Sequence, residues 1–144
     1  MDKSQLTELQ FLNELSGRII GAAIEVHKEL GPGLLEVAYE ICLTKELMSR
    51  GLKVETQIEL PLIYKGEQTG KTFRVDMLVD DTILVELKHV EQLMPVHEDQ
   101  LMTYLKLTGK KLGLLINFNV PFLKDGIRRR LNGFPYDGIK PVRG

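Results

Sequence analysis

The feature that most constrains the fold is a pair of strand-like runs joined by a short polar turn. Apolar residues alternate from Phe73 to Val79, the turn is Asp80-Asp81-Thr82, and a second run extends from Ile83 to Lys88. Alternate side chains of a strand share one face, so the two runs predict a hairpin. A three-residue turn pairs Val79 with Ile83, and this register places Asp76 opposite Glu86. A two-residue turn would instead turn Asp76 to the other face, so the register can be tested.

Asp76, Glu86 and Lys88 are the candidate site residues of this hairpin. Glu86 and Lys88 are two apart, so they share a face of a strand otherwise made of Ile, Leu and Val. Buried charges are costly without partners, and a divalent cation would relieve the repulsion between two neighbouring carboxylates. The Lys88 ammonium would stabilise charge on a phosphate or help to activate water. The pattern indicates a metal site for phosphodiester hydrolysis. The alternative is a surface strand with cross-strand ion pairs.

Hydrophobic periodicity predicts helices before this hairpin, and a helix and a strand after it. The expected helices lie at about 1–30 (one helix or two), 34–50 and 96–107, and the expected strands at about 53–64, 72–79, 83–88 and 112–118. Gly31-Pro32-Gly33 should end the first helical segment. Pro61 implies an edge position or a bulge in its strand. The order α-α-β-β-β-α-β predicts a mixed β-sheet flanked by helices, followed by an irregular tail at about 121–144.

Composition limits the class of protein. The 144 residues fit one domain, 1–144, and 43% hydrophobic with 27% charged residues is typical of a globular protein. No apolar run approaches the ~20 residues of a membrane span, and the N-terminus lacks the pattern of a secretory signal. The single cysteine, Cys42, excludes an internal disulfide framework and a cysteine-rich zinc site. We therefore expect a cytoplasmic protein.

Charge is unevenly distributed along the chain. Residues 1–100 hold 10 Lys and Arg against 18 Asp and Glu, whereas residues 101–144 hold 9 against 2. The basic third, with Arg128, Arg129 and Arg130, would either contact a nucleic-acid backbone or be a solvated basic tail. A fold that mixes both signs over its surface is the alternative to a phosphate-binding face.

Three motifs resemble those of a known enzyme family. Asp76 followed by Glu86-Leu87-Lys88 is similar to the D…(D/E)xK signature of the PD-(D/E)XK nuclease superfamily, with Val75 in place of its proline. Gln100-Leu101-Met102-Thr103-Tyr104 resembles the QxxxY motif of RecB-type members, and its two ends lie on one helical face. Residues 33–39 match GxxExxY, the motif that names a family of small bacterial and archaeal proteins in this superfamily. The resemblance covers about residues 10–134.

The resemblance implies a restriction-endonuclease-like core and a Mg²⁺- or Mn²⁺-dependent nuclease acting on DNA or RNA. Asp76, Glu86, the backbone carbonyl of Leu87 and Glu36 from the first core helix would hold the metal, and Lys88 would be the catalytic lysine. Gln100 and Tyr104 would support the metal site or contact the substrate. The alternative function is a non-catalytic nucleic-acid-binding or protein-assembly module that retains the fold. A homodimer is expected if the substrate is duplex DNA.

Three further residues have two interpretations each. Tyr39 would either orient the Glu36 carboxylate or pack in the core. Arg74 would bind phosphate or pair with a carboxylate, and the second arrangement is the more common. His97 would lie at the edge of the site or serve at the start of its helix.

Overall fold

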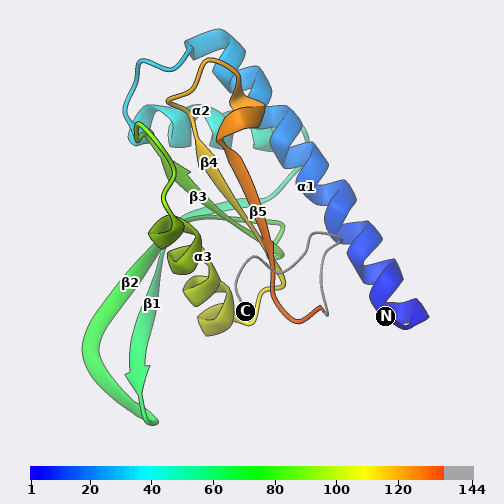
Figure 1. The fold of residues 1–144 in the computed structure, drawn as a ribbon, viewed down its shortest axis with the longest axis vertical. Helices are drawn as coiled ribbons and strands as arrows, with labels where there is room; N and C mark the ends of the chain where they lie inside the picture. The colour runs from blue at the N-terminus through cyan, green and yellow to red at the C-terminus, as the bar shows by residue number, and fades with distance from the viewer. Residues whose placement is uncertain (135–144) are drawn as a thin grey trace.

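The structure, a computed structural model, describes residues 1–134. In chain order the elements are α1 (Lys3–Leu30), α2 (Glu36–Ser49), β1 (Val54–Tyr64), β2 (Glu67–Val79), β3 (Ile83–Lys88), α3 (Pro95–Thr108), β4 (Leu112–Asn117), the 3₁₀ helix η1 (Leu123–Gly126) and β5 (Ile127–Leu131). Figure 1 shows α1 running along one side of the sheet, and the hairpin of β1 and β2 projecting as an arm. None of these helices combines the length and apolarity that a membrane span requires.

The five strands of the described chain form one mixed sheet in the order β1-β2-β3-β4-β5. Strands β3 and β4 are parallel and are connected through α3, whereas the other neighbours are antiparallel. A parallel pair needs such a crossover connection. The predicted mixed sheet with flanking helices is therefore confirmed, and the expected strands and helices lie close to their predicted positions.

The predicted register of the β2–β3 hairpin is confirmed. Val79 pairs with Ile83 and Met77 pairs with Val85, across a turn of residues 80–82. In the same register the next residues along the two strands are Asp76 and Glu86. The turn length therefore fixes which face of the sheet carries the two carboxylates.

Each face of the sheet has its own apolar core. Helices α1 and α2 cover one face, where β3 contributes Val85 and Leu87. Helix α3 covers part of the other face, where Leu84 and Leu115 pack against Leu101 and Leu105. Because β3 is buried on both sides, any charged side chain on it must find its partners within the protein.

The apolar side chains of the β1–β2 arm change from one face of the sheet to the other part-way along the arm. Val54 and Met77 pack toward α1 and α2, whereas Ile58 and Val75 pack toward α3. Residues two or four apart on a regular strand would share one face. The exchange occurs where Gln57 lies opposite Asp76 in the register, and Gln57 has a left-handed backbone with φ +53°. Asp76 is thus placed between the two layers.

The structure decides two predictions about the ends of the chain. The first 30 residues form one helix, which Gly31 ends with φ +69°. The prediction of an irregular tail from residue 121 is wrong, because η1 and β5 form there and β5 pairs antiparallel with β4. Three consecutive arginines conceal the strand, since polar side chains occupy both faces of an edge strand. Residues 135–144 of that tail lie outside the described part of the chain.

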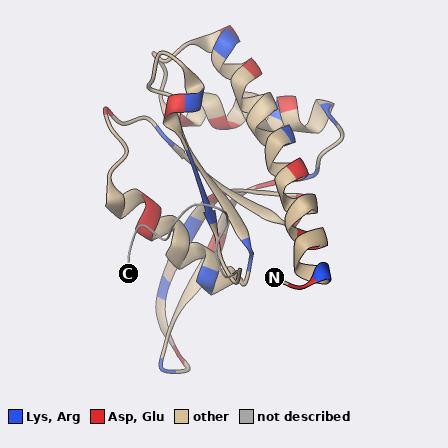
Figure 2. Ribbon diagram, turned by 45° about the vertical axis from the view of Figure 1, so that its right-hand side comes forward, with Lys and Arg blue, Asp and Glu red and all other residues tan. Residues whose placement is uncertain are grey.

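The fold brings the acidic and basic parts of the sequence together. Basic residues beyond position 100 pair with acids of the first 100: Lys110 with Asp81 (3.3 Å), Lys111 with Glu8 (2.7 Å) and Arg130 with Glu98 (3.7 Å). Figure 2 shows both signs of charge interspersed over the elements. These pairs favour the interpretation that both signs of charge are mixed over the surface, rather than a single basic face.

Candidate functional site

Backbone N–H groups of the β2–β3 hairpin hold the carboxylates of Asp76 and Glu86 in place. The Asp76 N–H donates to Glu86 Oε1 at 2.9 Å, and the Leu87 N–H donates to Asp76 Oδ2 at 2.8 Å. The two carboxylates therefore lie side by side at the point where β2 leaves β3. Only 4% of Glu86 is exposed, and Asp76 is half-buried. One oxygen of each carboxylate is therefore held in place by a backbone amide.

The electrostatics of the pair favour a bound proton. Burial, followed by the nearby Asp76 charge, raises the pKa of Glu86 to about 8. Burial also raises the pKa of Asp76, with a smaller contribution from Glu36, while the Leu87 amide and the Lys88 charge act in the opposite direction. Two adjacent carboxylates cannot both ionise easily in a poorly solvated site. At neutral pH the pair therefore retains close to one proton.

Helix α3 adds three polar groups to this site. Lys88, the last residue of β3, donates from Nζ to Gln100 Oε1 at 3.3 Å. Tyr104 is one turn further along α3, and its pKa is raised by burial and by the charges of Glu86 and Asp76. The structure thus brings Gln100 and Tyr104 of the QxxxY motif together with Asp76, Glu86 and Lys88.

The GxxExxY segment forms the loop after α1 and the first turn of α2. Glu36 is the first residue of α2 and is exposed, but it lies near enough to raise the pKa of Asp76. Tyr39 is fully buried and stacks on Phe118 with ring centroids 4.2 Å apart. Its hydroxyl donates to the Gly31 carbonyl and accepts from the Leu34 N–H. Of the two interpretations, Tyr39 packs, and it anchors the loop rather than the Glu36 carboxylate.

Two residues near the site were not found as candidates by sequence reasoning. Gln57 donates from Nε2 to Glu40 Oε1, and its side chain lies near enough to the Asp76 carboxylate to lower the pKa of that group. Glu40 follows Glu36 by one helical turn, a spacing that signals a shared face. No local sequence signal marks Gln57, because its position depends on the pairing of β1 with β2.

Asn117 fixes the chain that follows Lys88. Its buried side chain accepts from the Val90 N–H at 3.1 Å and donates to the Val90 carbonyl at 2.9 Å. The Phe118 N–H also donates to the Lys88 carbonyl at 3.1 Å. These bonds hold the end of β3, and with it Lys88, against the end of β4.

Arg74 and His97 have local partners. Arg74 lies on the arm and pairs with Glu59 at 3.4 Å, with both side chains 61% exposed. A carboxylate partner is therefore the interpretation that the structure supports. His97 Nδ1 accepts from the Met94 N–H at 2.9 Å at the beginning of α3. This bond gives His97 a role at the helix start.

The three arginines of β5 alternate between the faces of the sheet. Arg129 donates to Asn13 of α1, on one face. Arg130 pairs with Glu98 of α3, on the other. Arg128 is exposed and pairs in register with Leu115, which in turn pairs with Glu86 on the opposite side of β4. Arg128 therefore lies in the same cross-strand row as Glu86, two strand spacings or roughly 10 Å away.

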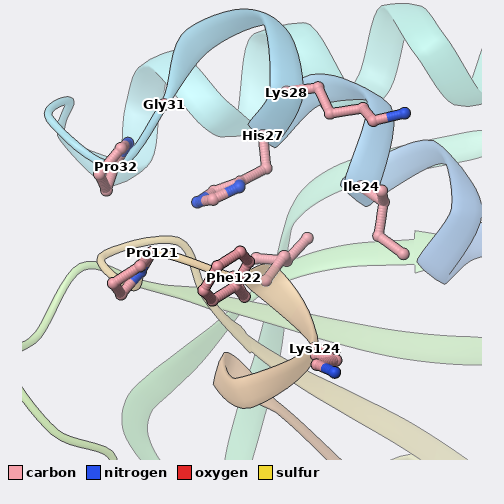
Figure 3. A pocket seen from close by; sticks show the side chains of 9 residues that line it. Ile24, His27, Lys28, Gly31, Pro32, Pro121, Phe122 and Lys124 are labelled. Atoms are coloured by element: carbon pink, nitrogen blue, oxygen red, sulfur yellow. The ribbon is translucent and has the colours of Figure 1, made fainter.

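A hollow of about 450 Å³ lies away from the carboxylates, between the end of α1 and the loop before η1. Figure 3 shows the His27 ring pointing from α1 toward Pro121 and Phe122. The His27 Nε2 lies 2.8 Å from the Val120 carbonyl, so this nitrogen carries the donated proton. The lining includes none of Asp76, Glu86 and Lys88.

The residues of the carboxylate site fit a divalent cation of the hard, oxygen-preferring type. Within residues 1–134, no three His, Cys, Asp or Glu side chains gather as a complete set of metal ligands. Mg²⁺ does not need such a set, because it commonly takes one or two carboxylates and completes its shell with water and phosphate oxygens. Asp76 and Glu86 supply two carboxylates that share a proton, and a cation would replace that proton.

Comparison with known proteins gives a family for this arrangement. The sequence model of the PD-(D/E)XK nuclease superfamily matches residues 13–130, a range that contains both carboxylates, Lys88 and α3. Comparisons with curated proteins and with solved structures found no match. Members of the superfamily generally use divalent metal ions and act on nucleic acid. The match spans most of the chain, and the protein belongs to the PD-(D/E)XK nuclease superfamily.

Proposed function

We propose that this protein is a Mg²⁺- or Mn²⁺-dependent nuclease of the GxxExxY type, which hydrolyses phosphodiester bonds of DNA or RNA. The observation that carries the proposal is the Asp76–Glu86 pair beside Lys88. Hydrogen bonds from the Asp76 and Leu87 backbone N–H groups, of 2.9 and 2.8 Å, hold the two carboxylates. A purely structural ion-pair network would not gather two adjacent carboxylates whose pKa values are both raised by burial. Such a cluster, partly closed to water, is typical of a catalytic site.

In this proposal Asp76 and Glu86 hold the cation, together with the Leu87 carbonyl, and Glu36 approaches from the beginning of α2. When bound, the cation would supply Lewis-acid stabilisation of the phosphodiester and a lowered pKa for the attacking water. Lys88 donates to the phosphate or to that water. Gln100 keeps the Lys88 ammonium directed at the site through their 3.3 Å contact.

Binding of the nucleic-acid backbone would extend from the carboxylates across the sheet. Arg128 lies in the row of Glu86 and is exposed, so it is the arginine of β5 best placed for a phosphate contact. Arg129 and Arg130 have partners on α1 and α3. We propose Arg128 as the phosphate contact of the three.

A cleavage assay tests the proposal. Purified protein is incubated with plasmid, linear duplex, single-stranded DNA and RNA, each with Mg²⁺, Mn²⁺ or EDTA. We expect cleavage of at least one substrate with a divalent cation, and none with EDTA. Lys88→Ala and Glu86→Ala, purified in parallel, should both be inactive.

The matched control is Lys106→Ala, because Lys106 is an exposed lysine of α3 that takes no part in the site. This variant should cleave like the wild type. Equal cleavage by wild type and Lys88→Ala would identify a contaminating nuclease and contradict the proposal. Salt-dependent nucleic-acid binding that survives both EDTA and Lys88→Ala, without any cleavage, would favour the non-catalytic binding module.

A further inference from the structure

Gln57 has a backbone conformation that a strand residue rarely adopts. Its φ is +53°, yet it lies inside β1, between positions paired with β2. The left-handed region is unfavourable for a residue with a long side chain, and such conformations persist only where surrounding structure enforces them. The other non-glycine residues with positive φ among residues 1–134 are Lys65, Asp80 and Asp81, and all three lie in turns.

The strained position coincides with the candidate site. Gln57 lies opposite Asp76 in the β1–β2 register, and the apolar pattern of both strands changes face at this pair. The strain is therefore located where Asp76 leaves the regular sheet. A β-bulge or similar irregularity beside a site commonly redirects one side chain.

The side chain of Gln57 lies between two acids that come from different elements. Its Nε2 donates one hydrogen to Glu40 Oε1 on α2. The same side chain lies near the Asp76 carboxylate and lowers its pKa, and the amide group is the only donor that it can offer there. An amide nitrogen has two hydrogens, so one can stay on Glu40 while the other is directed at Asp76.

We propose that Gln57 is a positioning residue for cation binding, which acts through Asp76. Its left-handed backbone turns the amide toward the site, and the amide holds the Asp76 carboxylate at a fixed distance from α2. Each carboxylate oxygen has two lone pairs, so a carboxylate that is held in this way can still ligate the cation. The inference rests on the proposed function, because it assumes that Asp76 binds a cation. Partners of this kind, which orient a ligand without touching the metal, typically change metal affinity by about 10- to 100-fold.

Two substitutions of Gln57 test its two properties, the strained backbone and the amide donor. Glycine adopts the left-handed backbone without strain but has no amide group. Methionine matches the length of glutamine and lacks the donor. The two substitutions therefore separate the backbone contribution from the hydrogen bonds.

The test measures Mn²⁺ affinity by calorimetry on metal-free protein, and the melting temperature of the same samples. For Gln57→Gly we expect Mn²⁺ affinity to fall by about tenfold or more. We also expect the melting temperature to stay equal or to rise by roughly 3 °C, because the strain is relieved. A merely structural role for Gln57 would instead lower the melting temperature and leave affinity unchanged. Gln57→Met should show the same fall in Mn²⁺ affinity without the rise in melting temperature. This variant provides the test if the glycine variant does not fold.

The matched control is Lys65→Gly. Lys65 has φ +49° in the turn between β1 and β2, remote from α2 and from the carboxylates. Relief of its strain should have a similar effect on the melting temperature and none on Mn²⁺ affinity. The inference is overturned if Gln57→Gly and Gln57→Met both bind Mn²⁺ within twofold of the wild type.

Asp76→Asn separates failure of the inference from failure of the proposed function. If wild type binds Mn²⁺ and Asp76→Asn does not, while both Gln57 variants bind normally, the inference alone is wrong. If wild type and Asp76→Asn bind equally, or neither binds, the proposed function is wrong and the inference falls with it.

Discussion

Val85 and Leu87 point from β3 into the layer of α1 and α2, whereas Glu86 and Lys88 point from the same strand toward α3. The first pair is buried among apolar side chains, with 0% and 3% exposure. The second pair belongs to a site in which burial raises the pKa of Glu86 to about 8. One strand thus has a face that stabilises the fold and a face that carries an electrostatic cost.

The difference shows how a small protein can hold a costly site. Apolar burial contributes about 25 cal/mol per Å², and the α1–α2 face of β3 is closed by a continuous apolar cluster. That cluster makes the strand rigid enough to hold two carboxylates together on its other face. Sites that are organised for function commonly reduce stability in this way. The comparison predicts that substitutions on the two faces will separate stability from activity.

Lys88→Ala should have the largest effect. The Lys88 ammonium is held beside the carboxylates by Gln100, and loss of a charge-stabilising donor typically costs 10²- to 10³-fold, or about 3–4 kcal/mol in the barrier. We expect cleavage to fall by about 10³-fold, while the free energy of unfolding changes by less than about 1 kcal/mol. Steady-state cleavage at saturating Mg²⁺ and urea denaturation measure the two quantities. An active Lys88→Ala enzyme would contradict the assignment of activity to the Glu86–Lys88 face of β3.

Leu87→Ala should have the opposite profile. Leu87 is buried in the α1–α2 cluster, and removal of a buried leucine side chain costs about 2–5 kcal/mol. Urea denaturation should show a loss of about 3 kcal/mol. The folded fraction should still bind Mn²⁺ with wild-type affinity, because only the backbone of Leu87 takes part in the site. A selective loss of Mn²⁺ binding without loss of stability would contradict this assignment.

Glu86→Gln should stabilise the metal-free protein at alkaline pH. The pKa of Glu86 is about 8 in the folded protein against 4.5 as its ordinary value, so the folded state binds more protons than the unfolded state between these values. Wild-type stability must therefore fall as pH rises from about 4.5 to about 8. Glutamine does not titrate, so the variant should lose this dependence and be more stable than the wild type at pH 8.5.

Denaturation at pH 5 and pH 8.5, in EDTA, measures the effect of Glu86→Gln. Glu59→Gln is the control, because Glu59 is an exposed acid on the arm. Its pH dependence should match that of the wild type. A wild-type protein whose stability rises over this pH range would show that Glu86 is ionised without cost.

Arg74→Ala should have the smallest effect. The Arg74–Glu59 pair is 61% exposed on both sides, and exposed ion pairs contribute little. The free energy of unfolding should change by less than about 0.5 kcal/mol, and cleavage should stay near the wild-type rate. A tenfold loss of cleavage would instead place Arg74 in contact with substrate.

Local patterns predicted the parts of the structure that depend on short distances in the sequence. The length of the 80–82 turn fixed the β2–β3 register, and the helical spacing of Gln100 and Tyr104 placed both near the site. These relations hold whatever the rest of the chain does, because turn length and helical repeat are local properties.

The parts that were missed depend on long-range pairing. β5 is a strand because it pairs with β4, although its three arginines look like a solvated tail. Gln57 reaches Asp76 only through the pairing of β1 with β2, and it reaches Glu40 only because α2 packs nearby. No local periodicity carries that information.

The most direct test of the account is the number of protons released when Mn²⁺ binds. Titration calorimetry at pH 7, in buffers of different ionisation enthalpy, gives this number for the metal-free protein. Because the Asp76–Glu86 pair retains a proton at this pH, we predict release of close to one proton per Mn²⁺ bound. Glu86→Gln should release none. Wild-type binding without proton release, or unchanged release in Glu86→Gln, would contradict the claim that this pair is the cation site.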